Sequence, residues 1–371
     1  MKIIQVVTYH SKDGAFGGPT RVAEAQCKAL AKLGHEVVLL AASPVEHVQK
    51  KDVDGYTLIL APAKRLHKSL GFAGVYAPNL NRELKRELSN ADVAHIHLAR
   101  DLVTLPAARA VIRSRVPLFL QTHGMVDKSQ KLLSKPLDLL WTLPVIKRAK
   151  LVLTLTDQED SDIAGLVSDA KIERINNGVE VKPLPAYANR PNKVVFLSRL
   201  QQRKRPVAFV EMARALAVTH PQLTFEIAGS DEGELEVILQ TIERLQLGDR
   251  VRVLGGIEPS QTDAFLEEAK VMVLPSFGEI FPMVLLEAFR AGTPAVVTDS
   301  LGIVGDCIKF GLAEVTSGDP LEMAKAVSRI LDDQKIAEGL RQRSLTFLEK
   351  NLNIEDVARQ LELSYKSWAQ D

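Results

Sequence analysis

The chain has 371 residues, of which 46% are apolar and 25% charged, an ordinary balance for a globular protein. No stretch approaches the roughly 18 apolar residues of a membrane span, and Cys27 and Cys307 lie in no metal-ligand spacing. The length exceeds what one hydrophobic core usually serves, so we expect two domains. A strand opens the chain where a signal peptide would show a different pattern, which together with the sparse cysteines predicts a cytoplasmic protein.

Charge is distributed unevenly along a chain whose net charge is only +1. Residues 1–150 hold 23 Lys+Arg and 12 Asp+Glu, whereas the remainder holds 24 and 34. The basic first half favours an anionic partner, either a membrane surface or a phosphate-bearing acceptor. Residues 65–72 and 141–150 mix basic and apolar side chains, and each is either a membrane contact or a solvated segment. The basic residues are not interleaved with stacking aromatics, which argues against nucleic acid.

Strands and helices alternate through the first half, as in a doubly wound parallel sheet. A glycine-rich loop containing Gly17 and Gly18 joins the first strand to the first helix, and it is either a phosphate-binding loop or a plain turn. The predicted strands are Ile3–Thr8, Val37–Ala42, Val93–His97, Leu118–Thr122 and Leu151–Thr156, and the predicted helix is Thr20–Leu33.

Several polar residues of the first half are candidates for a site. His123 follows the strand at Leu118–Thr122, where an imidazole can hydrogen-bond a ligand hydroxyl, although a lone histidine is more often structural. We expect His95 and His97 to point to opposite faces of their strand and therefore not to share a metal ion. The D-x-D pairs at Asp52 and Asp160 lie in a turn and an acidic helix start, so we predict no metal site.

Proline-rich residues 183–192 form the predicted linker between a first domain at 1–182 and a second at 193–352. Alternation restarts after the linker and indicates a second Rossmann-like domain. Its predicted strands are Val194–Ser198, Thr224–Ala228, Val251–Leu254, Val271–Leu274 and Ala295–Val297, and its predicted helices lie at Pro206–Ala217, Leu235–Leu245 and Thr262–Ala269.

Two cations follow the first strand of the second domain. Arg199 and Lys204 are five residues apart in this loop, and two cations at the carboxyl end of a strand can neutralise a diphosphate without a metal. Solvated surface charge is the alternative. Gly229 opens the loop after the next strand.

The most informative stretch is residues 275–294, PSFGEIFPMVLLEAFRAGTP. It lies between two apolar runs and predicts a loop carrying Glu279 and then a helix carrying Glu287. Pro282 suits the first helical position and Gly292 the position after the helix end. N–H groups at the helix start, from Phe281 to Val284, can hold a diphosphate, and each carboxylate can accept hydrogen bonds from hydroxyls. This combination suits a sugar nucleotide.

These motifs resemble those of retaining glycosyltransferases with the GT-B fold, above all glycosyltransferase family 4. Glu279 and Glu287 match its E-x7-E motif, with Ile280 where a Gly is usual. Arg199 and Lys204 match its R-L-x-x-x-K-G string, in which Arg205 replaces the Gly and puts the loop shape in doubt. The resemblance implies that Glu279 and His123 contact the donor sugar, that Glu287 contacts the ribose, and that Arg199 and Lys204 hold the phosphates. The implied donor-binding residues are Gly17, Gly18, Arg199, Lys204, Gly229, Glu279, Ile280, Phe281, Pro282, Met283, Val284 and Glu287.

The resemblance implies two Rossmann-like domains with a cleft between them and a last helix, 353–371, that crosses back to the first domain. It also implies metal-independent transfer, with retention, of a hexose from a nucleotide sugar. Mannose from GDP-mannose is favoured, with UDP-glucose and UDP-N-acetylglucosamine left open. The expected acceptor is a lipid-linked or polysaccharide-bound sugar, in surface-glycan synthesis at the inner face of the plasma membrane. The alternatives are a GT-B epimerase and a non-catalytic sugar-nucleotide-binding subunit.

Overall fold

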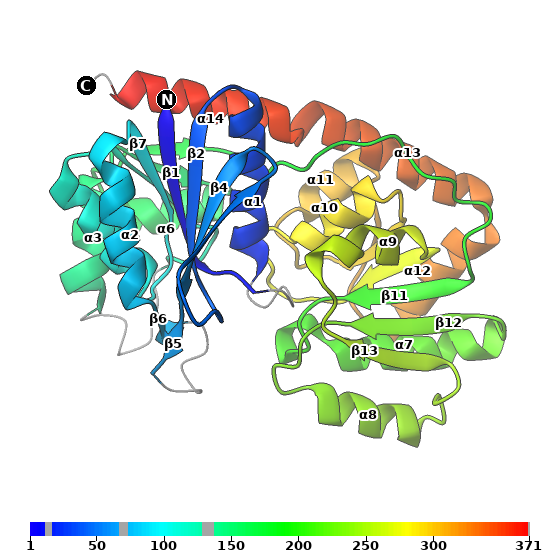
Figure 1. Cartoon of the computed structure of the whole chain (residues 1–371). Coiled ribbons are helices and arrows are strands. Elements are labelled where there is room, and N and C mark those ends of the chain that lie inside the picture. The colour runs from blue at the N-terminus through cyan, green and yellow to red at the C-terminus, as the bar shows by residue number, and fades with distance from the viewer. Residues whose placement is uncertain (12–16, 67–72, 128–136, 370–371) are drawn as a thin grey trace. The chain divides into compact units, whose positions relative to one another are not determined.

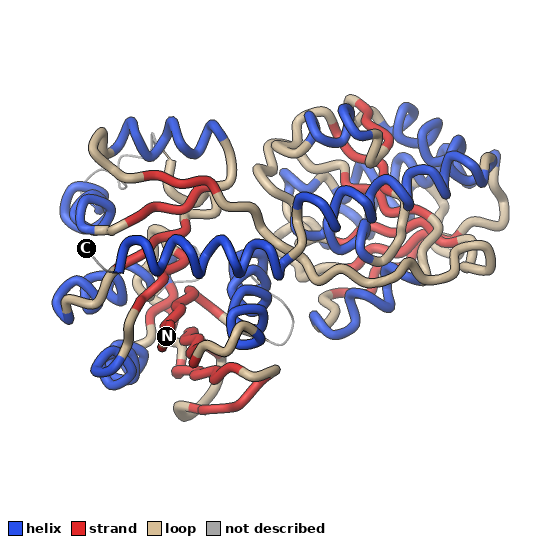
Figure 2. The backbone as a smooth tube through the Cα atoms, turned by 90° about the horizontal axis from the view of Figure 1, so that it is seen from above, coloured by secondary structure: helices blue, strands red, loops and turns tan. Residues whose placement is uncertain are grey.

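The computed structural model describes residues 1–11, 17–66, 73–127 and 137–369. They form two compact units. Unit 1 holds the described residues up to Gly178 and the chain from Ile354 onward, and unit 2 holds Val179–Asn353. In each unit a mainly parallel sheet lies between helices (Figure 1, Figure 2). The expected class, two Rossmann-like α/β domains, is confirmed.

Unit 1 is built on an eight-stranded sheet in the order β10-β9-β8-β7-β1-β2-β4-β3, in which β3 runs antiparallel to β4. The chain leaves β1 to one side for β2 and to the other for β7. Ligands of such sheets bind beyond the carboxyl ends of the strands at this switch point. The strands are β1 Lys2–Tyr9, β2 Glu36–Ser43, β3 Gln49–Val53, β4 Tyr56–Pro62, β7 Val93–His97, β8 Leu118–Gln121, β9 Leu151–Thr154 and β10 Ile172–Arg174, and a separate antiparallel pair joins β5 Lys64–Arg65 to β6 Val75–Tyr76.

Both faces of this sheet are buried because successive residues of a strand point to opposite sides. Ile4 packs in one core with α2, α3, α5 and α6, and Ile3 packs in a second core with α1 and α14. Buried parallel strands of this kind have long apolar runs, which is why β1 and β2 were predicted correctly. The helices are α1 Gly17–Lys32, α2 Pro78–Glu87, α3 Thr104–Ser114, α5 Leu143–Arg148, α6 Asp157–Leu166 and α14 Ile354–Ala369, with a π-helical turn, η3, at Asp138–Thr142.

Unit 2 has a six-stranded parallel sheet in the order β13-β12-β11-β14-β15-β16. Its switch point lies between β11 and β14. One face is covered by α7, α8 and α12, the other by α9, α10 and α11, and α13 contributes to both cores. The elements are β11 Lys193–Leu197, η4 Gln202–Lys204, α7 Pro206–Thr219, β12 Thr224–Ala228, α8 Leu235–Arg244, β13 Val251–Gly255, η5 Pro259–Gln261, α9 Thr262–Glu267, β14 Val271–Leu274, α10 Met283–Arg290, β15 Ala295–Thr298, α11 Val304–Phe310, β16 Glu314–Thr316, α12 Pro320–Asp332 and α13 Gln334–Asn351.

The chain passes between the units at two neighbouring points. A Cβ atom on Gly178 would lie 2.6 Å from Cα of Ile354, so only glycine lets the segment after β10 approach the start of α14 this closely. The N–H of Val179 donates to the carbonyl of Leu352 at 2.9 Å. The described part of the final segment, α14, belongs to unit 1, where it packs against α1.

Residues 183–192, which we expected to be a linker, belong to unit 2 and are held firmly there. The ring of Tyr187 is buried, with cations of Arg190, Lys270 and Arg341 at 5.3, 4.7 and 4.8 Å from its centre. The Arg190 guanidinium donates to two backbone carbonyls in the segments that follow α9 and α10, at 3.0 and 2.7 Å. Prolines gave this segment the composition of a linker, but its buried side chains make it part of a domain.

The β3–β4 hairpin is an element that the sequence patterns above did not predict. Its turn is Asp54-Gly55, and both residues have positive φ, 48° and 89°. An Asp-Gly pair between alternating residues is a hairpin signal of the type I′ kind. The hairpin adds the only antiparallel strand to the described part of the unit 1 sheet.

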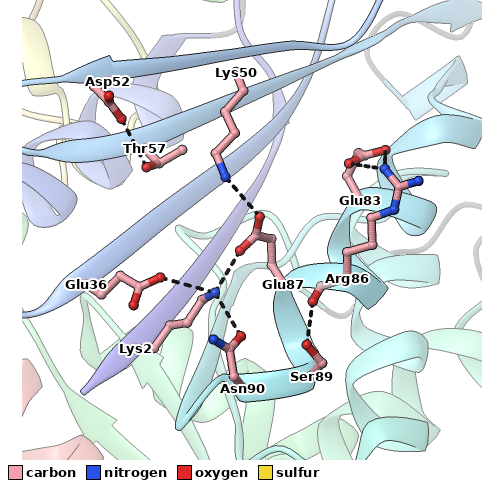
Figure 3. A network of polar contacts seen from close by, with 10 residues as sticks. All are labelled: Lys2, Glu36, Lys50, Asp52, Thr57, Glu83, Arg86, Glu87, Ser89 and Asn90. Carbon is pink, nitrogen blue, oxygen red and sulfur yellow. Dashed lines mark hydrogen bonds and ion pairs between the residues drawn. The ribbon is translucent and has the colours of Figure 1, made fainter.

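A polar network fastens the amino end of β1 to its neighbours (Figure 3). Nζ of Lys2 lies 2.8 Å from Glu87, 2.9 Å from Asn90 and 3.2 Å from Glu36, and Nζ of Lys50 lies 3.4 Å from Glu87. Burial acts to raise the pKa of Glu87, but hydrogen bonds and charges from the two lysines outweigh it and lower that pKa. Glu87 therefore stabilises the fold while it is ionised.

We expect Glu87→Gln to lower the free energy of unfolding of unit 1 by about 2 kcal/mol at pH 7, because it removes charged hydrogen bonds to a buried lysine. Urea unfolding measures this. Because the folded pKa is lowered, the difference should shrink as the pH falls below about 4, where the wild type also becomes protonated. Glu83→Gln is the control, since Glu83 pairs only with exposed Arg86 one turn away among the contacts of Figure 3. Equal destabilisation by both variants would contradict this assignment.

Candidate functional site

The switch point of unit 2 brings together two loops that are far apart in sequence. The loop after β11 carries Arg199 and Lys204, and the loop after β14 carries Glu279. Because β11 and β14 are adjacent parallel strands, their carboxyl ends lie at the same edge of the sheet. The N–H of Phe277 donates to the carbonyl of Arg203 at 2.9 Å and joins the two loops directly.

Lys204 and Glu279 form an ion pair at this edge, with Nζ donating to Oε1. Lys204 is only 4% exposed. Burial lowers its pKa, and the Glu279 carboxylate opposes that effect without cancelling it. The other oxygen of Glu279, Oε2, is buried and has no hydrogen-bond partner among the described residues. The pair therefore places a buried cation beside a carboxylate whose second oxygen has no hydrogen-bond partner among the described residues.

Arg199 has a carboxylate partner of its own, Glu232, at 2.8 Å. This contact depends on a close approach of the loops after β11 and β12. A Cβ atom on Gly229 would lie 1.8 Å from the carbonyl oxygen of Ser198, and its φ is 156°, so glycine is required there. The sequence predicted Arg199 and Gly229 as site residues but did not indicate Glu232, whose role depends on this contact between loops.

The helix that follows Glu279 begins one residue later than predicted. Pro282 is the N-cap of α10, with extended backbone, and Met283 is the first helical residue. Ile280, Phe281, Met283 and Val284 are all partly exposed around this start, and the first turn of a helix has N–H groups without intrahelical partners. The carbonyl of Ile280 lies so close to Gly302 that a Cβ atom there would be 2.1 Å from it.

Glu287 lies inside α10 and is only 5% exposed, so it is not a solvated helical glutamate. A carboxylate is rarely buried in this way unless it has partners or a function. Glu279 lies in the loop that precedes α10 and Glu287 is buried within α10, which is consistent with the E-x7-E interpretation of the sequence.

Arg205, which stands where the family pattern has glycine, keeps the glycine-like conformation. Its φ and ψ are 54° and 48°, in the left-handed region that glycine adopts without strain. Its guanidinium donates to the carbonyl of Gly318 at 2.9 Å and lies 4.3 Å from the centre of the Phe277 ring. These contacts offset the backbone strain. The sequence left in doubt whether Arg205 changes the conformation of this loop, and the loop has a conformation that glycine would also adopt.

In unit 1, His123 lies in the turn after β8 and also has a positive φ, 49°. The turn is held by Glu159, a buried residue in the first turn of α6. Glu159 accepts hydrogen bonds from the hydroxyl of Thr122, from the N–H of Gly124 at 2.6 Å and from the N–H of Leu155 at 2.7 Å. Glu159 was not among the residues predicted from the sequence, although a T-x-x-E capping signal at 156–159 could have marked it.

The expectation that His95 and His97 face opposite sides of β7 is wrong. Their rings are stacked, with centres 4.7 Å apart and planes 15° from parallel. Residues two apart on a strand share a face because side chains alternate with a period of two. His97 stacks in turn on His123, at 5.0 Å, so β7 supplies a buried neighbour of the candidate site residue.

The glycine-rich loop of the first half lies largely outside the described residues. Gly17 and Gly18 are described, and they open α1. An added Cβ on Gly18 would meet no heavy atom within 4 Å among the described residues, so packing alone does not require glycine there. The contact of Gly17 and Gly18 with a donor remains a prediction from the sequence.

Two family models match the chain. Residues 16–182 match the model described as Glycosyltransferase Family 4, and residues 184–345 match the model described as Glycosyl transferases group 1. Together these two ranges account for most of the sequence.

Two curated relatives are similar over most of the chain and a third over about half of it. A glycogen synthase of Mycobacterium tuberculosis is 26% identical, with 92% of this chain and 89% of the relative covered. A component of the phosphatidylinositol N-acetylglucosaminyltransferase of Arabidopsis thaliana is 25% identical, with 94% and 78% covered. A D-inositol 3-phosphate glycosyltransferase of Corynebacterium jeikeium is 31% identical over about half of each chain, 53% and 52%.

Solved structures share the fold along nearly the whole length. A sucrose-phosphate synthase from Thermosynechococcus elongatus superimposes with a TM-score of 0.75 at 19% identity, with 99% of this chain and 98% of that chain covered. Anabaena HepE, solved in complex with UDP and glucose, gives a TM-score of 0.75 at 18% identity, with 99% and 100% covered. At these identities the similarity establishes the fold.

Proposed function

Because this chain belongs to the family 4 glycosyltransferases, with the GT-B fold, we propose that it transfers a hexose from a nucleotide sugar with retention at the anomeric carbon. The observation that supports this most strongly is the buried Lys204–Glu279 pair at the switch point of unit 2. It combines a cation for phosphate with an acceptor for a hydroxyl, which is what a sugar diphosphate needs.

We assign each of these residues to one part of the donor. Lys204 and Arg199 neutralise the leaving diphosphate, and N–H groups in the first turn of α10 add to them. Within unit 2, Glu279 orients the sugar and Glu287 accepts hydrogen bonds from the ribose hydroxyls. For His123 of unit 1, a contact with the sugar is proposed from the family resemblance of the sequence alone. Since two cations supply the neutralisation, we propose that no metal is required.

The proposed reaction is a substitution on one face of the sugar. The bond between the anomeric carbon and the phosphate oxygen breaks, and a bond from the acceptor oxygen forms on the same side. The acceptor's proton passes to the departing phosphate. The protein contributes positioning and charge neutralisation in this scheme, and no side chain forms a covalent intermediate.

The identity of the donor stays a prediction. The family resemblance of the sequence motifs favours GDP-mannose. A 2-deoxystreptamine N-acetyl-D-glucosaminyltransferase of Niallia circulans, 31% identical over 41% of this chain, and the Arabidopsis relative carry names that point to N-acetylglucosamine. A donor test must therefore include GDP-mannose, UDP-glucose and UDP-N-acetylglucosamine.

Thermal unfolding in the presence of EDTA tests the donor site. Binding to the native state raises the midpoint, by an amount that grows with ligand concentration over Kd. We expect one nucleoside diphosphate and its sugar to raise it in the wild type and not in Glu287→Gln. A shift that needs added Mg²⁺ would contradict metal independence, and no shift with any nucleotide would contradict the transferase assignment.

Product analysis separates the two alternative functions. A transferase retains the sugar on an added glycan or lipid-linked acceptor, whereas an epimerase would release a new sugar or nucleotide sugar without any acceptor. A non-catalytic subunit would bind nucleotide sugar without turnover.

We also propose that unit 1 contacts an anionic membrane at the cytoplasmic face, where a lipid-linked acceptor would reside. Leu139 and Leu140 on η3 are 68% and 60% exposed, and Lys147 and Arg148 are exposed on the adjoining α5. Apolar side chains beside basic ones suit a surface of anionic lipid. No helix within the described ranges is long and apolar enough to cross a bilayer. Of the other basic stretch, 65–72, only Arg65 and Leu66 are described.

Vesicle co-sedimentation tests this contact. We expect the protein to bind phosphatidylglycerol vesicles in low salt, to release in high salt because surface charges are screened, and to ignore phosphatidylcholine. A variant with Leu139→Asp and Leu140→Asp should lose binding. Leu239→Asp is the control, because Leu239 is a comparably exposed leucine of unit 2. Wild-type binding by the double variant would overturn the proposal.

A further inference from the structure

A chain of buried hydrogen bonds leads from the interior of unit 1 to His123. Nδ1 of His97 lies 2.7 Å from Nε2 of His123, and Nε2 of His97 lies 2.9 Å from Oε1 of Gln5. The Gln5 amide nitrogen lies 3.5 Å from Oε1 of Gln26, whose own amide nitrogen donates to Gln121 at 3.0 Å. Gln5, Gln26 and Gln121 are fully buried and His97 is 1% exposed, so water does not compete for the contacts among these four residues. His123, at the end of the series, is partly exposed.

The chain has a direction, because an amide oxygen can only accept a hydrogen bond. Gln5 and Gln26 direct their side-chain nitrogens at the oxygen of the next glutamine, and Gln121 directs its nitrogen at Oδ1 of Asn177, at 3.4 Å. This orientation leaves the oxygen of Gln5 facing His97. Nε2 of His97 must therefore carry a proton and donate it.

Burial keeps the imidazoles neutral. It lowers the pKa of His97 well below its usual value and the pKa of His123 to about 3. A neutral imidazole has one N–H, so His97 protonated at Nε2 has an unprotonated Nδ1 that accepts. The 2.7 Å contact then requires a proton on Nε2 of His123. By the same rule, Nδ1 of His123 is an unprotonated acceptor.

We infer that His97 and Gln5 are positioning residues that hold His123 in the tautomer with Nδ1 unprotonated, so that His123 accepts a hydrogen bond from a hydroxyl of the donor sugar. The hydrogen bond from a sugar hydroxyl rests on the proposed function, whereas the tautomer of His123 follows from the contacts within unit 1 alone. Fixing the tautomer in the free protein means that no proton has to move when the sugar binds. A freely exchanging ring would present N–H in the same direction part of the time and repel the hydroxyl's hydrogen.

Long-range proton–nitrogen NMR correlation on protein labelled with 15N-histidine reads the tautomers directly. In the wild type at pH 7 we expect His97 and His123 to carry their proton on Nε2, with His123 assigned from its loss in His123→Gln. A His123 ring protonated at Nδ1, or at both nitrogens, overturns the inference whether or not the protein transfers a sugar.

His97→Leu removes the acceptor and should give His123 a mixture of tautomers. It should also lower kcat/KM for the nucleotide sugar about tenfold, the effect of about one hydrogen bond. His97→Asn can place an oxygen close to the position of Nδ1 and should recover both the single tautomer and most of the activity. An unchanged tautomer or unchanged kcat/KM in His97→Leu overturns the positioning role.

His95→Gln is the matched control. His95 is also a fully buried histidine of β7, and its Nδ1 bonds the hydroxyl of Tyr365, at 2.7 Å. That hydroxyl also contacts Gln5, so glutamine is chosen at position 95 because its side chain keeps an acceptor for Tyr365. Losing this ring should leave the tautomer of His123 unchanged, and a change there would mean that ring stacking, and not the hydrogen bond that His123 donates to His97, selects it. If no nucleotide sugar is turned over by the wild type, the proposed function fails, whereas the NMR result still decides the tautomer.

Discussion

Glu279→Gln is expected to lower kcat/KM by about 10²- to 10³-fold, the range seen when one preorganised polar contact to a transition state is removed. In this protein Oε1 of Glu279 accepts from Lys204, while buried Oε2 has no hydrogen-bond partner among the described residues. An amide keeps the size and one acceptor, but it replaces the other oxygen with a donor and removes the charge that holds Lys204.

Steady-state kinetics with the donor found by thermal unfolding measures the effect. Glutamine is preferred to alanine, because alanine would leave buried Lys204 next to a cavity and mix a folding defect with a catalytic one. Glu236→Gln, an exposed glutamate on α8 of the same unit, is the control and should turn over normally. Wild-type turnover by Glu279→Gln would remove this residue from the active site.

Lys204→Met is expected to reduce kcat/KM by a similar 10²- to 10³-fold, roughly the loss of one charged contact to the transition state, because the lysine is proposed to neutralise the diphosphate as it leaves. Methionine fills much of the space of the buried stem. It leaves the Glu279 carboxylate without its partner, however, which should also lower the free energy of unfolding by about 3 kcal/mol.

Combining the two substitutions separates these effects. The double variant Lys204→Met with Glu279→Gln should be more stable than Lys204→Met alone, because no unpaired charge stays buried, yet it should have no more activity. The control is Lys193→Met, since Lys193 bridges Glu226 and Glu268 at 3.0 Å each in the same unit; it should lose stability but keep turnover. Recovery of activity in the double variant would mean that Lys204 acts only through folding.

The local parts of the fold follow from the order of residues along the chain. Apolar runs such as Val271–Leu274 predicted buried parallel strands correctly, because a strand covered on both faces has few polar positions. The E-x7-E string of 275–294 and the basic loop at 199–204 suggested the family. Each motif lies within one short loop–helix segment of its own, so each can be recognised from the sequence without knowing which segments lie next to it in the fold.

Relations between distant segments could not be predicted in this way. Lys204 and Glu279 are 75 positions apart, and they meet because β11 and β14 are adjacent at the switch point of the sheet. Glu232 was missed for the same reason, since its contact with Arg199 depends on the close approach of two loops at Gly229. The segment 183–192 looked like a linker because prolines are counted along the chain, whereas Tyr187 is packed against Lys270 and Arg341, which come from distant parts of the chain.

His123 illustrates both sides of this division. Its place at the end of a strand made it a candidate from the sequence. Its support by Glu159 and its fixed tautomer depend on residues from distant parts of the chain, since the hydrogen bonds that reach His123 pass through Gln26, Gln5 and His97. Local order along the chain determined which groups this protein carries at its strand ends, and the packing of its strands determined how those groups are paired, because hydrogen bonds and charges act over a few ångströms of space and not along the sequence.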